Sequence, residues 1–397
     1  MKPVYIVDGA RTPFLKSRNR PGPFSAADLA TQAGRTLLVR QPFAPSELDE
    51  VILGCAAPSV DEVNIGRVAA LRMGCGQKVP GWTVMRNCAS GMQAVDSAIN
   101  NILAGRSKLV LAGGVDALSR APLLYAEKMV LWFSDMAAAR TTGQRQTAEN
   151  LAHRFGITRG EMDVFAVRSH QRVAKAQADG DLAPGGGEVE ALYDASGKAY
   201  ALDDGVRADA SLESLAKLKP FFDRKYGNVT AGNSSQITDG AAWLLLADEE
   251  ALREHNLQPL GRIVDSEWAG LDPAQMGLGP VHAATPILKR HGLGLNDLDF
   301  WEINEAFAAQ VLGCLAAWKD ERYCREELGL DGALGELEQN RLNVDGGAIA
   351  LGHPVGASGT RIVLHLLKTL HRTGKKRGIA SICIGGGLGG AMLVEAL

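Results

Sequence analysis

The sequence predicts a layered α/β fold with more than one domain. Its 397 residues exceed one ordinary domain, and a hydrophobic content of 46% is enough for a sizeable core. Strand-like and helix-like segments alternate along most of the chain, which is the pattern of helices layered on a sheet. The 46 glycines lie between apolar runs without a fixed period, as expected for many tight strand–helix turns.

The first part of the chain predicts one α/β unit. We expect strands at residues 4–8, 51–54, 82–86 and 109–114, and helices at 26–38, 64–71 and 90–103. Residues 109–114 form an apolar run ended by glycines, which is typical of a buried parallel strand. Apolar residues in 90–103 recur at helical spacing.

From about residue 118 to 235 the chain is more polar and irregular, with one expected helix near 160–178. Its acidic and basic residues are balanced, so it is not a charged tail. We predict an insertion carried on the core, a kind of segment that often holds binding residues.

Core-like sequence returns at residues 237–247, followed by what resembles the start of a second α/β unit. We expect strands at 261–265, 298–302 and 378–384, and a helix at 362–370. The segments VYIVD (4–8) and RIVD (262–265) are faintly alike, which is weak evidence for duplication.

Composition excludes several classes of protein. The net charge of −3, without a basic run, argues against binding to nucleic acid. None of the six cysteines forms a CxxC pair, so we expect no zinc ribbon and no other metal site. The chain shows neither a signal-peptide pattern nor a run of eighteen apolar residues, so we expect a cytoplasmic protein without a membrane span.

Cys88, in the segment NCASGM, is expected at a strand-to-helix turn. Free N–H groups and the positive end of the helix macrodipole stabilise a thiolate there, which lowers the pKa of the cysteine. Taken alone, a buried structural cysteine is the commoner explanation, because free cysteine is among the most buried residue types.

Three later stretches stand out: NEAFAA beginning at Asn304, GHPVGASG containing His353, and CIGGGLG beginning at Cys383. Each has an ordinary explanation. Asn304 could cap a helix, His353 could be a hydrogen-bonded turn residue, and Cys383 could fill the core. The last run also looks like a dinucleotide loop, but neither a βαβ unit nor an acidic ribose ligand follows it.

Together these four stretches resemble the thiolase family, in family order and spacing from end to end of the chain. Cys88 matches the acylated cysteine, Asn304 the Asn of NEAF, His353 the His of GHPxGxSG, and Cys383 the second cysteine of CxGGGxG. The resemblance implies a five-layered αβαβα core of two similar halves with an inserted loop domain. The halves would be residues 1–117 plus 236–257 and residues 258–397, with a CoA-binding insertion at 118–235.

The resemblance also implies binding residues. Those expected to contact CoA, its pantetheine arm or the acyl group are Arg207, Ser214, Phe222, Ala231, Ser235, Ile237, Met276, Ala306 and Phe307. Two departures leave chain length open. Residues 143–146 lack the His-Met-Gly motif of short-chain biosynthetic thiolases. Residues 204–235 look like the thiolase subunit of the trifunctional complex, which usually has His in place of Asn304.

The chemistry implied is a reversible Claisen reaction, either CoA-dependent cleavage of a 3-ketoacyl-CoA or condensation of two acetyl-CoA. His353 would take the proton of Cys88, which becomes the acyl carrier, and Cys383 would protonate the leaving carbanion. His353 and a water oriented by Asn304 would stabilise the enolate. The N–H groups of Cys88 and Gly385 would stabilise the oxyanion of the tetrahedral intermediate. CoA is a substrate, so we expect no cofactor.

Two alternatives remain at this point. A ketoacyl-synthase-like condensing enzyme would generally lack Cys383, and a non-catalytic acyl-CoA or sterol carrier would be expected to have lost a catalytic residue. The resemblance implies acyl-CoA and CoA as ligands and a β-oxidation subunit as a partner. It also implies that the chain forms a homodimer or homotetramer. A group of apolar residues precedes the segment TAEN (147–150). They either close the acyl end of the substrate pocket or line a channel for medium-length acyl chains; they are Leu123, Leu124, Met129, Val130, Leu131, Trp132 and Phe133.

Overall fold

The computed structural model describes residues 3–121 and 144–397, and one large sheet runs through this part of the chain. The N-terminal half supplies β1 (Val4–Arg11), β2 (Leu15–Lys16), β3 (Glu50–Gly54), β4 (Gly81–Val84), β5 (Leu109–Ala117) and β8 (Thr238–Ala247). The C-terminal half supplies β9 (Gly261–Gly270), β10 (Phe300–Ile303), β11 (Arg377–Ile384) and β12 (Leu388–Ala396). The strand order is β10-β11-β12-β9-β1-β8-β5-β3-β4, and β2 pairs with β8.

The two halves join where β1 pairs antiparallel with β9, through Val4 with Ile263, Tyr5 with Arg262 and Ile6 with Gly261. These are the two segments that look alike in the sequence, so the resemblance lies in the strands that meet between the halves. Within each half, parallel pairing follows the expected crossovers: β3 lies between β4 and β5, and β10 lies beside β11.

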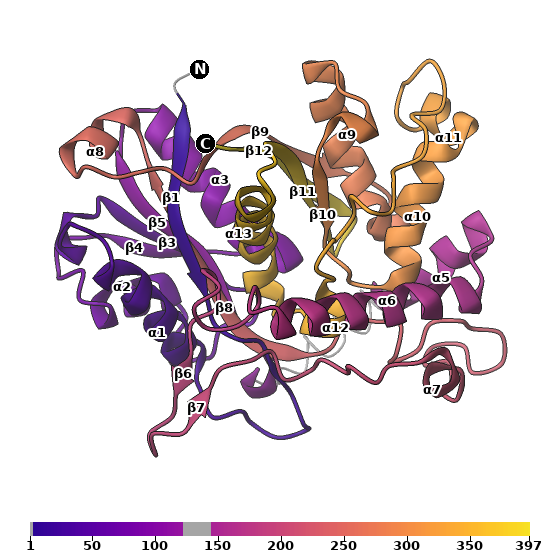
Figure 1. Ribbon diagram of the computed structural model, residues 1–397, viewed down its shortest axis with the longest axis horizontal. Helices are drawn as coiled ribbons and strands as arrows, with labels where there is room; N and C mark the ends of the chain where they lie inside the picture. Colours follow the sequence, from indigo (N-terminus) through magenta and orange to yellow (C-terminus); the bar gives the residue numbers. More distant parts are fainter. Residues whose placement is uncertain (1–2, 122–143) are drawn as a thin grey trace, which may run out of the picture.

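The helices form three layers around the two parts of the sheet. In the middle, α3 (Ser90–Leu103) and α13 (Val355–Thr373) pack on each other, and a buried cluster joins them to strands of both halves. Outside the N-terminal strands lie α1 (Ala26–Val39) and α2 (Ile65–Arg72). Outside the C-terminal strands lies α9 (Gly279–His291), with α10 (Ala308–Lys319) beside it. The expected five layers are confirmed (Figure 1).

Two elements differ from the sequence-based expectation. Helix α13 is longer than residues 362–370, because Pro354 leads directly into it and Gly374 ends it in a left-handed conformation. Strand β12 was not predicted. Gly386 and Gly387 adopt φ of 97° and 83°, which reverses the chain so that β12 pairs antiparallel with β11.

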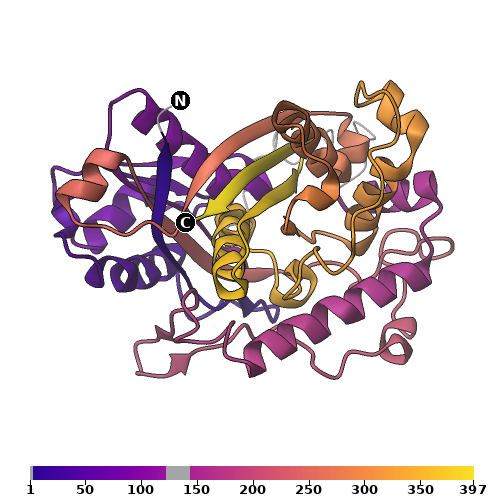
Figure 2. The same ribbon diagram turned by 45° about the horizontal axis from the view of Figure 1, so that its top comes forward.

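The insertion lies along one edge of the molecule and spans both halves (Figures 1 and 2). Its elements are α5 (Gln144–Phe155), α6 (Arg159–Ala178), β6 (Leu192–Tyr193), β7 (Ala199–Tyr200) and α7 (Leu212–Ala216). Short helices elsewhere are α8 (Glu249–Glu254), α11 (Glu321–Glu326) and α12 (Ala348–Leu351). Buried Arg11 of β1 binds Glu188 and Asp203, which ties the insertion to the core. No helix in the described residues is long and apolar enough to span a bilayer.

Candidate active site

Cys88 lies in a single 3₁₀ turn, Asn87–Ala89, between β4 and α3. The predicted strand-to-helix turn is therefore confirmed, although the strand ends two residues earlier than expected. Ser90 closes the turn, since its hydroxyl accepts the Arg86 N–H at 2.9 Å and donates to the Asn87 carbonyl at 2.7 Å. Asn87 itself adopts a φ of 43°.

The expectation of a lowered pKa for Cys88 is wrong. The side chain is only 5% exposed, and burial raises the pKa of the thiol. The N–H groups of Gly385 and of Cys88 itself hydrogen-bond to the sulfur and oppose this effect, but they do not overcome it. Cys88 therefore rests as a thiol and needs a base before it can act as a nucleophile.

His353 has the arrangement of such a base. Its Nδ1 lies 2.6 Å from the Ser358 hydroxyl, which donates its one proton to the Pro354 carbonyl at 3.1 Å. The hydroxyl must then accept Nδ1–H, which leaves the lone pair on Nε2. Nε2 is buried and has no hydrogen-bond partner within the described chain. Burial, and then the charge of Arg361, lower the pKa of His353 to about 4, so the imidazole is neutral.

Asn304 and Cys383 stand at the carboxyl ends of neighbouring parallel strands. The Asn304 N–H donates to the Ser381 carbonyl at 2.9 Å, while both atoms of its side-chain amide are buried without a partner among the described residues. Cys383 is fully buried, and burial followed by interaction with Cys88 raises the pKa of its thiol well above the usual value. The Gly385 carbonyl accepts a hydrogen bond from the Asn87 side chain at 2.9 Å, which ties the two cysteine-bearing turns together.

Glu305 holds the turn after Asn304. Its carboxylate accepts the Ser169 hydroxyl at 2.6 Å, the Asn343 amide at 2.9 Å and the Ile349 N–H at 3.2 Å. These partners come from α6 and from the segment leading to His353. The supporting role of Glu305 is not visible in the sequence, because its partners are distant in the chain.

Cys88 and His353 line one cavity of about 840 Å³. Predicted binding residues that also line it are Phe222, Ala231, Ser235, Ile237, Met276, Ala306 and Phe307. Lining residues that the sequence analysis did not identify are Lys16, Ser17, Asn19, Leu118, Phe221, Thr230, Ser234, Gln236 and Val355. Five of them lie in or next to stretches already singled out (Phe221, Thr230, Ser234, Gln236 and Val355). Residues 16, 17, 19 and 118 lie outside those stretches, and no local pattern marks them.

Two predicted CoA contacts are not among the residues that line this cavity. Arg207 lies against buried His170: its N–H donates to Nδ1 at 3.1 Å, and its guanidinium lies 3.3 Å from Nε2. The Ser214 hydroxyl donates to the Ser211 carbonyl at 2.8 Å as part of the cap of α7. The apolar residues 123–133, expected at the acyl end, lie outside the described residues.

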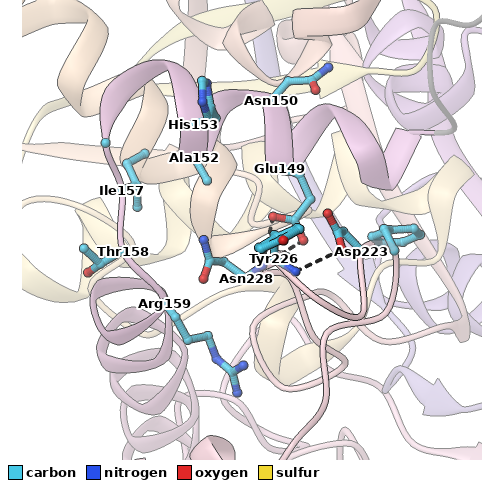
Figure 3. Close-up of a pocket in the computed structure, with 13 residues that line it drawn as sticks. Glu149, Asn150, Ala152, His153, Ile157, Thr158, Arg159, Asp223, Tyr226 and Asn228 are labelled. Atoms are coloured by element: carbon cyan, nitrogen blue, oxygen red, sulfur yellow. Dashed lines mark hydrogen bonds between the residues drawn. The ribbon is translucent and has the colours of Figure 1, made fainter.

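A second cavity, of about 750 Å³, shares the lining residue Phe222 with the first. Figure 3 shows this second cavity, with Glu149 and Asp223 among its lining residues. Its carboxylates are already engaged by the backbone: Glu149 accepts N–H groups of Asn228 and Val229, and Asp223 those of Lys225 and Tyr226. These contacts shape the loop that carries Phe222, and neither Cys88 nor His353 borders this second cavity.

A cavity that joins a cysteine to a neutral histidine has the arrangement of enzymes in which a histidine activates a cysteine nucleophile. Models of the thiolase N-terminal and C-terminal domains match residues 4–250 and 257–396, respectively. The chain belongs to the thiolase family, whose members are acyltransferases of CoA-dependent Claisen chemistry. This membership decides against the ketoacyl-synthase alternative.

Individual relatives cover nearly the whole chain. The 3-oxoadipyl-CoA/3-oxo-5,6-dehydrosuberyl-CoA thiolase of Escherichia coli is 40% identical over 419 residues, covering 100% of both proteins. The 3-ketoacyl-CoA thiolase of Serratia proteamaculans is 36% identical over 423 residues, covering 99% of this chain and 96% of its own. The crystal structure of human mitochondrial 3-ketoacyl-CoA thiolase in complex with CoA superimposes with a TM-score of 0.87 at 35% identity, covering 100% of this chain and 98% of the human one.

Proposed function

We propose that this thiolase cleaves 3-ketoacyl-CoA to acetyl-CoA and a shortened acyl-CoA through an acyl group carried on Cys88. The observation that carries this proposal is the shared cavity of Cys88 and His353, in which the base is neutral and its Nε2 has no partner among the described residues. His353 takes the proton of Cys88 as the sulfur attacks the 3-keto carbon. The C2–C3 bond then breaks, and a CoA thiol, again activated by His353, later releases the acyl group.

Cys383 is the second acid and base in this proposal. Its raised pKa keeps the thiol protonated, as an acid that must protonate the acetyl-CoA carbanion requires. The unpartnered amide of Asn304 would orient a water that, with His353, holds the enolate oxygen. The N–H groups of Cys88 and Gly385, which now bond the sulfur, would hold the tetrahedral oxyanion. CoA enters as a substrate, and no cofactor takes part in the proposed steps.

CoA is proposed to bind along the insertion, with its pantetheine arm beside Ala231, Ser235 and Ile237 in the cavity wall. Arg207 and Ser214 would contact the nucleotide end outside this cavity. The division into residues 1–117 plus 236–257, 118–235 and 258–397 is kept as the proposed domain organisation. It agrees with the insertion lying across both halves.

For the acyl group we propose medium chains of six to eight carbons as well as acetoacetyl-CoA. Support comes from the apolar part of the cavity wall, where Met276, Ala306 and Phe307 lie. Each fully buried methylene is worth about 0.8 kcal/mol, or about fourfold, so kcat/KM should rise at least several-fold from four to eight carbons. The Escherichia coli relative is named for 3-oxoadipyl-CoA, so this compound should be compared as a substrate with the unbranched 3-ketoacyl-CoAs.

We further propose a homodimer or homotetramer in the cytoplasm, and a β-oxidation partner subunit suggested by the resemblance of residues 204–235 to the trifunctional complex. All six cysteines are free thiols, which supports a reducing compartment. The oligomer is supported by exposed apolar residues around the edge strand β4: Val60, Val63 and Met85 are 71%, 67% and 63% exposed.

The proposal is tested by trapping the intermediate. Brief incubation with a 3-ketoacyl-CoA in the absence of free CoA should leave one acyl group on the peptide that holds Cys88, and Cys88→Ala should leave none. Full turnover by Cys88→Ala would overturn the proposal. Thiolysis rates over four, six and eight carbons then test chain length, and a steep fall beyond four carbons would assign the enzyme to short chains.

A further inference from the structure

Asp116 is a fully buried carboxylate near the end of β5, outside the catalytic set described above. One of its oxygens, Oδ1, accepts the Cys55 S–H at 3.2 Å and the N–H groups of Ala56 and Ala57 at 3.2 and 2.9 Å. The other, Oδ2, accepts the N–H of Gly356 at 2.5 Å. Four donors thus converge on one carboxylate.

The Gly356 N–H belongs to the first turn of α13, three residues after His353. N–H groups in a first helical turn lack intrahelical partners, and a negative charge there is favourable. This turn lies in close contact with β5: a Cβ on Gly114 would lie 1.9 Å from the Gly356 carbonyl oxygen. The backbone of α13 therefore rests directly on β5, and Asp116 binds it from that strand.

The other partners of Asp116, which are the Cys55 S–H and the N–H groups of Ala56 and Ala57, belong to the turn that follows β3. The Cys55 N–H donates to the Val84 carbonyl at 3.1 Å, so this turn is bonded to the end of β4, from which the chain runs into the Cys88 turn. The Asp116 carboxylate consequently bridges the strand ends that support Cys88 and the helix start that supports His353. Its negative charge also interacts with Cys88 and raises the pKa of that thiol.

We propose that Asp116 is a positioning residue of the acyl-transfer reaction, which fixes the start of α13, and with it His353, against the strand ends that carry the Cys88 turn. The inference rests on the proposed function, because it assumes that His353 is the base for Cys88. It adds to the catalytic residues a carboxylate that need not touch the substrate.

The test compares Asp116→Asn, Asp116→Glu and the control Asp49→Asn in the full-length enzyme. Asp49 is matched because it binds two backbone N–H groups, of Lys108 and Leu109, at the opposite end of β5. Two experiments are done on each variant. Steady-state kinetics give kcat and KM for thiolysis of acetoacetyl-CoA, and alkylation by iodoacetamide, measured on the Cys88 peptide, gives the pH dependence of the Cys88 thiol.

In Asp116→Asn, a side-chain NH₂ group replaces one of two oxygens that both accept hydrogen bonds. The new donor would face another donor, so the start of α13 should shift. We expect kcat to fall about 100-fold, the scale of a misplacement near 1 Å, with KM for CoA within about twofold. The alkylation midpoint should move to lower pH, because the removed charge raised the pKa of Cys88. Asp116→Glu keeps the charge, so it should keep the midpoint but still lower kcat, and Asp49→Asn should change neither.

A kcat within twofold of wild type for Asp116→Asn overturns the inference. If Asp116→Asn does not fold, Asp116→Glu decides, and a wild-type kcat for that variant overturns the inference as well. A wild-type enzyme without thiolase turnover would instead refute the proposed function, and the alkylation profiles would still report whether Asp116 acts on Cys88.

Discussion

At the scale of single residues, Ser358 sets the state of the base. It is 1% exposed, and its hydroxyl links Nδ1 of His353 to the Pro354 carbonyl. In Ser358→Ala the imidazole can adopt the other tautomer or turn away from Cys88. We expect kcat to fall by about 10²-fold with little change in KM. Steady-state kinetics test this, with Thr373→Ala, which removes a hydroxyl near the other end of α13, as the control. Equal kcat for both variants would contradict the role of Ser358.

A second prediction separates Cys383 from Asn304. Cys383→Ser should still be acylated at Cys88 by acetyl-CoA, which forms no carbanion, but it should lose exchange of the α-protons of acetyl-CoA, because the acid and base for that carbon is gone. Asn304→Ala should slow both exchange and turnover by about 10²-fold without abolishing either, the effect of removing one oxyanion contribution. Mass spectrometry of acetyl-CoA in D₂O measures exchange. Loss of acylation with normal exchange in Cys383→Ser would mean that the two cysteine roles are reversed.

At the scale of elements, α13 carries a buried, charged imidazole, His365, in contrast to the neutral His353 that precedes the helix. His365 lies 2.9 Å from Glu188 and 3.2 Å from Asp345. Burial alone would lower the pKa of His365, but the charge of Glu188 and the hydrogen bonds to both carboxylates outweigh it and raise the pKa to about 10. Because Glu188 belongs to the insertion, this ion network connects the insertion to α13.

The folded-state pKa of His365 lies above the value near 6.5 expected for an unfolded chain. Its contribution to stability is therefore fully present below about pH 6.5 and is lost as the pH rises through about 10. The free energy of unfolding should fall between pH 7 and pH 10, and it should fall less in His365→Gln, which should itself be less stable by about 3–5 kcal/mol at pH 7. Urea unfolding at both pH values tests this, and equal pH dependence in the two proteins would contradict it.

At the scale of the whole molecule, β4 lies at one end of the sheet order, and its edge is flanked by exposed Val63 and Met85. An unpaired edge with apolar neighbours is suited to pairing with a second copy of the chain. Val63→Glu combined with Met85→Glu should place like charges in such an interface and shift the protein to monomer. Light scattering measures the mass, and Val39→Glu, at an 84% exposed position on α1, is the control. A wild-type mass for the double variant would exclude this edge as the interface.

The fold was largely predictable because its strands and helices carry local patterns. The four motifs indicated five layers, and comparison with known thiolases confirmed them. Strand β12 was missed because it depends on a reversal at Gly386 and Gly387 rather than on the apolar run alone. The cavity was predicted only in part, since residues such as Lys16 and Ser17 reach it through the pairing of β2 with the distant strand β8.

The sequence by itself determined which groups are available for chemistry: Cys88, His353, Cys383 and Asn304, each at a turn that follows or opens a regular element. Tertiary structure decided their states. Helix-end geometry alone predicted a lowered pKa for Cys88, but enclosure by both halves raises it. The tautomer of His353 and the anchoring by Asp116 likewise depend on packing. The physical reason is that the dielectric surroundings and hydrogen-bond partners of a buried group come from segments hundreds of residues apart, which no local pattern records.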